Sequence, residues 1–186
     1  TSSLSFSQED GQAVDQDGNS FPWKTYGDLD WSLQNATVVT FRDGTNINYT
    51  HGSDWNNKPT TSSNWTYAYN AGYPEKRLYD WCAVIGIVDQ ASAGDVSLRK
   101  QLAPSGWRVA TKSDWENLAS YLNANGYTHN NNPTPSDPKE NIAKSMAYTQ
   151  NSINNWTISA IVGSPGNNVN TNNSSGFGAK PVGYRA

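Results

Sequence analysis

Apolar and polar residues alternate over several short segments in the first half of the chain, and this alternation is typical of half-buried strands. The alternating apolar residues are Phe21 and Trp23, Trp31 and Leu33, and Trp65, Tyr67 and Tyr69. A β-branched run at 37–41 predicts a further strand, which Asp43-Gly44 should end in a hairpin-type turn. The pattern therefore predicts a few short strands joined by turns.

Three later segments repeat their apolar residues every three or four positions, which predicts helices. In the segment 77–85, Trp81 belongs to the face that we expect to be buried. The second helix has the clearest start, because Thr111 and Asp114 fit a capping box, and a third should begin after Asp137. The buried stripe of the second helix is expected to be Trp115, Leu118, Ala119 and Leu122. The sequence thus predicts an α+β fold with two or three helices, small antiparallel sheets and long loops.

The length of 186 residues suits one domain. Residues 1–14 carry no strong period and are expected to form an N-terminal arm or an edge strand, with the domain itself over 15–186. Asn, Ser, Thr and Gly together make up 74 of the 186 residues, and eight Trp and ten Tyr stand among them. We therefore expect an aromatic core, and we expect Trp31, Trp81, Trp107 and Trp115 to belong to it.

The charge pattern excludes two classes of partner. The net charge is -3 with 13 Lys and Arg, which offers no basic surface for nucleic acid or for an anionic membrane. No apolar run approaches 18 residues, so we expect no membrane insertion. Low lysine content with many Asn, Ser and Thr residues favours a mature, processed chain that is extracellular or on the cell surface.

Several motifs follow one another in an order and spacing that are typical of one family. They are Asp15-x-Asp17-Gly18-Asn19, Phe41-Arg42-Asp43-Gly44-Thr45, Arg77-Leu78-Tyr79-Asp80-Trp81, Pro104-Ser105-Gly106-Trp107-Arg108, Asn141-Ile142-Ala143-Lys144-Ser145 and Ser175-Gly176-Phe177. From about residue 15 to its end, the chain resembles the Fibrobacter succinogenes major paralogous domain of Bacteroidetes-type bacteria. The resemblance implies a C-type-lectin-like fold, a surface setting and no established enzymatic activity.

The chain departs from this family at its C-terminal side. Family members usually continue through a Trp-Ser-Ser segment to a final strand, and they often carry a cysteine where this chain has Ala103. We therefore expect that the usual C-terminal segment is lacking, or that a partner chain completes the fold by adding strands to an open sheet edge.

Candidate catalytic and metal-binding residues are few. His51 and His129 lie in polar loop sequence, and Cys82 lies on an apolar helix face without a neighbouring base, so we expect no enzyme. Asp15, Asp17 and Asn19 have a spacing that could offer oxygens to Ca²⁺. An EF-hand loop starting at Asp15 would need Gly and Glu at positions where Ser20 and Tyr26 stand. A structural turn without a cofactor is the favoured interpretation, and Ca²⁺ is the weaker alternative.

Aromatic residues in or beside polar loops are the candidate ligand-binding residues. They are Trp55, Trp65, Tyr67, Tyr127 and Trp156. A sugar ring can stack its apolar C–H face on Trp or Tyr, while Asn, Asp and Ser bind its hydroxyls. The alternative is that these rings bury large areas and hold the long loops in place.

The sequence thus favours a non-enzymatic, surface-displayed binding domain that serves adhesion by recognising a glycan or a protein receptor. The alternative is a structural subunit of a fibre, pilus or phage appendage, assembled by strand complementation between chains. An enzyme is the least favoured class.

Overall fold

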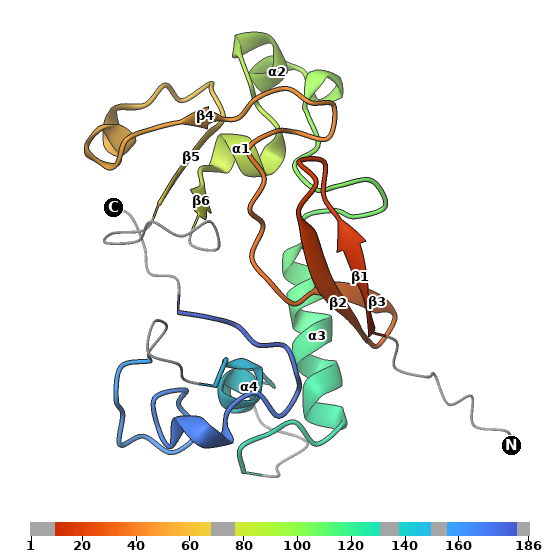
Figure 1. The fold of residues 1–186 in the computed structure, drawn as a ribbon, viewed down its shortest axis with the longest axis vertical. Coiled ribbons are helices and arrows are strands. Elements are labelled where there is room, and N and C mark those ends of the chain that lie inside the picture. Colours follow the sequence, from red (N-terminus) through yellow and green to blue (C-terminus); the bar gives the residue numbers. More distant parts are fainter. Residues whose placement is uncertain (1–9, 68–76, 131–137, 150–155, 182–186) are drawn as a thin grey trace, which may run out of the picture. The chain divides into compact units, whose positions relative to one another are not determined.

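The computed structural model describes residues 10–67, 77–130, 138–149 and 156–181 (Figure 1). Within them, the helices are α1 (Trp81–Ile85), α2 (Gln90–Gly94), α3 (Lys112–Ala124) and α4 (Pro138–Met146). The strands are β1 (Asp10–Val14), β2 (Ser20–Tyr26), β3 (Leu29–Ser32), β4 (Asn48–Tyr49), β5 (Asn64–Tyr67) and β6 (Arg77–Tyr79). Short 3-10 helices are η1 (Gly52–Asn57), η3 (Val96–Leu98) and η4 (Val169–Thr171). The expected α+β class is confirmed.

The strands form two small sheets in the orders β1-β2-β3 and β4-β5-β6. In the first sheet, β2 and β3 are antiparallel, with Tyr26 opposite Leu29, and β1 is an edge strand. In the second sheet, β5 pairs antiparallel with β6 but parallel with β4. The expectation of purely antiparallel sheets is therefore wrong for the second sheet. A long connection that includes η1 separates β4 from β5, and it lets the chain return to pair in the same direction.

The chain divides into two compact units. Unit 1 comprises residues 1–13, 22–34 and 110–181, and unit 2 comprises residues 14–21, 35–109 and 182–186. Each unit has a hydrophobic cluster of its own among the described residues.

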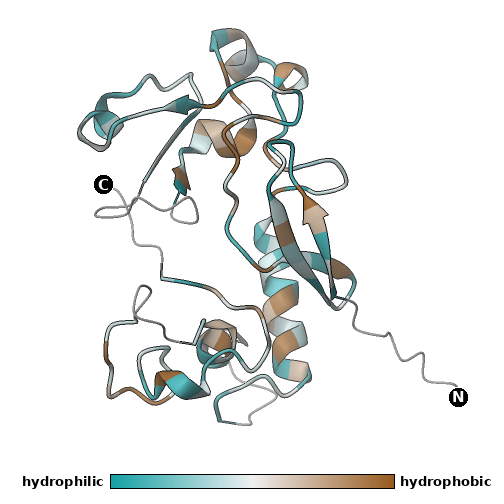
Figure 2. Cartoon of the chain, viewed as in Figure 1, coloured by the Kyte–Doolittle hydropathy of each residue, from teal (hydrophilic) through white to brown (hydrophobic). Residues whose placement is uncertain are grey.

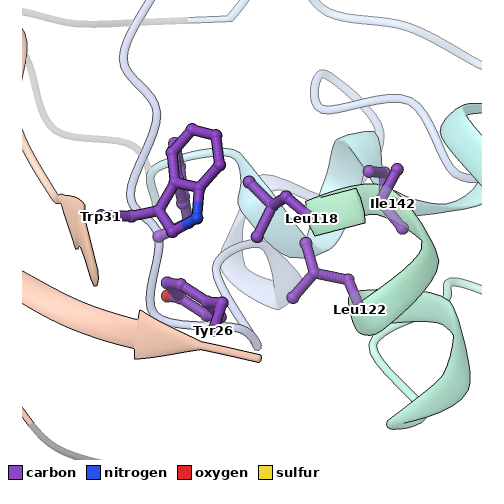
Figure 3. Packing of buried hydrophobic residues seen from close by; sticks show 7 residues of the cluster. Tyr26, Trp31, Leu118, Leu122 and Ile142 are labelled. Atoms are coloured by element: carbon purple, nitrogen blue, oxygen red, sulfur yellow. The ribbon is translucent and has the colours of Figure 1, made fainter. Parts of the chain in front are cut away.

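The core of unit 1 is built around α3. Thr111 caps this helix, because its hydroxyl accepts a hydrogen bond from the Asp114 amide while the Asp114 carboxylate accepts one from the Thr111 amide. Leu118 and Leu122 point from α3 toward Tyr26 and Trp31 (Figure 3). The rest of the α3 surface is largely polar, so apolar and polar residues alternate along it (Figure 2). The predicted capping box and the Leu118, Ala119 and Leu122 part of the stripe are confirmed, whereas Trp115 is 47 % exposed.

The core of unit 2 is built from loops as much as from strands. Its buried residues are Val38, Phe41, Ile47, Trp65, Ala83 and Leu102. The predicted strand at 37–41 is absent from this described segment, which forms only an isolated bridge between Thr40 and Asn46. The turn itself is present, since the Gly44 amide donates to the Phe41 carbonyl and Gly44 has a φ of 83°.

The predicted helix at 77–85 begins later than expected. Residues Arg77–Tyr79 form β6, and Asp80 then caps α1 by accepting a hydrogen bond from the Ala83 amide at 2.8 Å. Only five residues remain in the helix, and Cys82 and Ala83 are the ones it buries. Trp81 is 71 % exposed, so its expected place in the core is wrong.

Candidate ligand-binding surface

Most charged and polar residues of the sequence motifs are bonded within the fold. Arg42 donates to the carbonyl oxygens of Ala103 (2.9 Å), Pro104 (2.8 Å) and Trp107 (2.7 Å), so one motif holds the next. Asp43 pairs with Lys100 at 2.5 Å. That contact, together with the hydrogen bond from the Thr45 amide, lowers the pKa of the Asp43 carboxyl to about 2.

The Asp15–Asn19 segment forms a turn through the oxygens that a metal ion would need. Asp15 Oδ1 accepts from the amides of Asp17 (3.0 Å) and Asn19 (2.8 Å). The Asp17 carboxylate accepts from the Val39 amide and the Thr40 hydroxyl. Across the described residues, no group of three or more His, Cys, Asp or Glu side chains is placed to hold a metal ion. The geometry is that of a structural turn, and it offers Ca²⁺ no free set of carboxylates.

Lys144 plays a similar part in unit 1. Its side chain is buried, and its ammonium donates to the carbonyls of Asn167 and Asn168 and to Asn172 Oδ1. Burial lowers the pKa of Lys144. Ser175 donates through its hydroxyl to the Ser145 carbonyl at 2.8 Å, which joins the same segments again. These motif residues therefore serve the scaffold, and a ligand must find its contacts elsewhere.

The sequence-predicted catalytic candidates are held in ordinary structural contacts. Cys82 is buried, its thiol donates to the Thr60 carbonyl at 3.0 Å, and burial raises its pKa. His51 lies 3.0 Å from the Ser53 hydroxyl in unit 2, whereas His129 lies beside the Asn141 carbonyl in unit 1. The two histidines thus belong to different units.

Two of the five sequence-predicted aromatic candidates meet on the second sheet. Trp65 and Tyr67 are two positions apart on β5, so their side chains emerge on the same face. Tyr49 pairs with Trp65 across β4 and β5, and Arg77 pairs with Tyr67 across β5 and β6. The strand register therefore places Tyr49, Trp65, Tyr67 and Arg77 on one face, and we call these four residues the sheet cluster.

The rings of the sheet cluster are in mutual contact. Their centroids are 4.8 Å apart for Tyr49 and Trp65, 5.3 Å for Trp65 and Tyr67, and 6.3 Å for Tyr49 and Tyr67. Trp65 is 9 % exposed and belongs to the core, whereas Tyr49 is 52 % exposed. The buried tryptophan is thus a foundation, and the tyrosines are the rings that a ligand can reach.

Arg77 completes the sheet cluster with a positive charge. Its guanidinium carbon lies 4.5 Å from the centroid of the Trp65 ring, which is a cation–π distance. Its Nε is buried and has no hydrogen-bond acceptor. Tyr79 on the same strand is anchored instead, because its hydroxyl donates to the Val38 carbonyl at 2.8 Å and burial raises its pKa.

The remaining candidates lie apart from the sheet cluster. Trp55 on η1 is half-buried, and the Lys58 ammonium covers its ring at 4.3 Å. In unit 1, Tyr127 packs against the core, and Trp156 donates from Nε1 to the Tyr148 carbonyl at 3.1 Å. Tyr69 lies outside the described residues. The sequence interpretation missed Tyr49 and Arg77, which it placed in a loop and in a helix.

The structure defines an α+β domain whose motif residues hold its loops and whose open aromatic sheet face is the candidate site. The chain belongs to the family described as the Fibrobacter succinogenes major domain, whose profile matches residues 25–186. No curated protein and no solved structure matches the chain. The C-type-lectin-like topology therefore stays a prediction. Family membership suggests a surface domain without a specific function, and none of the described helices has the length and apolar character to cross a membrane.

Proposed function

We propose that this domain is a non-enzymatic binding domain that is displayed outside the cell or on its surface and recognises a glycan through the sheet cluster. The observation that carries the proposal is the pairing of an exposed tyrosine with a buried tryptophan on one sheet face. Tyr49 presents its ring to solvent, while Trp65 and Tyr67 fix that ring from below and beside it. A rigid, exposed tyrosine suits the apolar C–H face of a sugar, because little side-chain entropy is lost on binding.

The internal bonding of the motif residues supports the same proposal. Arg42 and Lys144 are fully engaged with loop carbonyls and an asparagine side chain. A scaffold stabilised in this way can vary the residues on its open sheet face without losing its fold. A protein receptor is the alternative ligand, and the glycan is favoured because the exposed part of the cluster is a small aromatic surface flanked by polar loop residues.

The test compares two tyrosine-to-serine and tryptophan-to-serine variants on immobilised glycans. Tyr49→Ser should weaken binding to the retained glycan at least tenfold, because the stacking surface is lost. Trp81→Ser is the matched control, since Trp81 is also an exposed aromatic residue of unit 2 but lies outside the sheet cluster. The control should bind like the unchanged protein.

Two outcomes would contradict the proposal. If no glycan of a broad plant, animal and microbial panel is retained, glycan recognition is wrong. If a glycan is retained but Tyr49→Ser and Trp81→Ser bind it equally well, binding takes place outside the sheet cluster. Circular dichroism spectra of both variants would show that each remains folded.

A further inference from the structure

Arg77 differs from the other cations described above in having hydrogen-bond donors without an acceptor. Arg42 and Lys144 donate to carbonyls and an amide oxygen, and Lys24, Lys100 and Lys112 pair with carboxylates. Among the described residues, Arg77 takes part in no ion pair and its Nε has no partner. A buried donor that lacks an acceptor raises the free energy of the unliganded protein.

The orientation of Arg77 is fixed by its surroundings. The side chain begins on β6, opposite Tyr67, and its guanidinium lies over the Trp65 ring at 4.5 Å. A guanidinium that stacks on a ring keeps its N–H donors at its edge, where they can meet an acceptor in the plane of the group. The fork of two parallel N–H donors matches the two oxygens of a carboxylate.

We infer that the ligand of the sheet cluster is an acidic glycan, in which the carboxylate of a uronic acid residue pairs with Arg77 while the sugar ring stacks on Tyr49. This inference rests on the proposed function and names the class of glycan. Its two contacts come from neighbouring positions: Tyr49 pairs with Trp65, and the Trp65 ring carries the Arg77 guanidinium. One sugar residue with a carboxylate next to its apolar face can therefore engage both.

Charge complementarity at this site is local. The whole chain carries a net charge of -3, which gives an acidic polysaccharide no general attraction. A preference for acidic over neutral sugars must therefore come from a placed cation. Lys58, the other half-buried cation on an aromatic ring of unit 2, already donates to the Trp55 carbonyl at 3.2 Å. Arg77 is thus the better-placed cation for the carboxylate.

The experiment compares acidic polysaccharides with the same polymers after methyl esterification of their carboxyl groups. The probes are polygalacturonate, alginate and hyaluronate, and each ester removes the charge while the sugar rings stay the same. We expect at least one acid form to bind about tenfold more tightly than its ester, since a charge-assisted pair replaces a neutral contact. Arg77→Gln should abolish this difference by weakening the acid form alone, and Arg77→Lys should retain part of it.

Lys58→Gln is the matched control, because it removes one positive charge from unit 2 without touching the sheet cluster. It should keep the preference for the acid form. If all three acid forms bind no better than their esters while Tyr49→Ser still weakens neutral glycan binding, the inference is wrong and the proposed function stands. If Lys58→Gln and Arg77→Gln reduce the preference equally, the effect is one of net charge, which also contradicts the inference. If no acidic or neutral glycan binds, the proposed function itself is wrong.

Discussion

The two units contain aromatic clusters with similar ring spacing and different cover. In unit 1, the ring centroids of Trp31 and Trp115 are 4.7 Å apart and those of Tyr26 and Phe177 are 6.0 Å apart. In unit 2, Tyr49 and Trp65 are 4.8 Å apart. Ring contact alone therefore does not distinguish a core from a binding surface.

The cover over each cluster makes the difference. Leu118 and Leu122 from α3 lie against the rings of unit 1, and Tyr26 is only 2 % exposed (Figure 3). The sheet cluster of unit 2 leaves half of the Tyr49 side chain exposed. The comparison teaches that the same residue types stabilise one unit and equip the other for recognition, according to whether an apolar helix face lies on them.

The largest expected effect comes from cutting into the covered cluster. Leu122→Ala should lower the free energy of unfolding by about 3 kcal/mol, because Leu122 is fully buried and its removal leaves a cavity. Tyr49→Ser should lower it by less than about 1 kcal/mol, because its ring is half exposed. Urea unfolding followed by circular dichroism measures both values.

Equal losses for these two variants would contradict the comparison. In that case Tyr49 would be a packing residue, and the sheet cluster would be a second core rather than a surface. Leu29→Ala offers a further control within unit 1, because this side chain packs against the covered cluster but is only partly buried. Its loss should lie between the other two.

The sequence predicted most reliably what local interactions determine. The start of α3 depends on Thr111 and Asp114, which are three positions apart, and its stripe depends on the helical period. The turn at Asp15–Asn19 likewise follows from side chains that bond to backbone groups within four residues. These elements needed no knowledge of distant segments.

The candidate site could not be predicted in the same way, because it depends on strand pairing. Tyr49 lies on a strand of two residues, which is too short to show an alternating pattern. Arg77 fits a helical period in the sequence, but Asp80 starts the helix after it, and β5 takes 77–79 as its partner. Trp65 and Tyr67 were found as candidates, yet only the register shows that one is a foundation and the other lies beside an exposed ring.

The second prediction compares the two cations that hold loops. Lys144 is 9 % exposed and Arg42 is exposed, although each donates three hydrogen bonds. Lys144→Met should lower the free energy of unfolding by about 2 kcal/mol, because buried oxygens of Asn167, Asn168 and Asn172 lose their donor. Arg42→Met should cost less than about 1 kcal/mol, since water can replace the donor at exposed carbonyls.

Thermal unfolding of the two variants tests this difference, and hydrogen exchange locates it. Faster exchange after Lys144→Met should be found in the segments that Lys144 joins, around 167–173. A larger loss for Arg42→Met would mean that unit 2 depends on its exposed polar contacts more than on its apolar cluster, which would reverse the comparison between the units.

The smallest expected effect isolates one exposed ion pair of unit 2 through its pH dependence. The contact with Lys100 and the Thr45 amide lower the pKa of Asp43 from its ordinary value of 3.8 to about 2. The folded protein therefore binds this proton less readily than the unfolded chain does, so the stabilisation is present above pH 4 and is lost as the pH falls toward 2. Because the Asp43 side chain is 45 % exposed, water screens the pair, and Asp43→Asn should cost less than about 1 kcal/mol at pH 6. Free energies of unfolding of both proteins, measured from pH 6 to pH 2, should converge at the acidic end. A difference that stays constant over this range would show that Asp43 acts through its neutral hydrogen bonds to the 43–45 turn rather than through its charge.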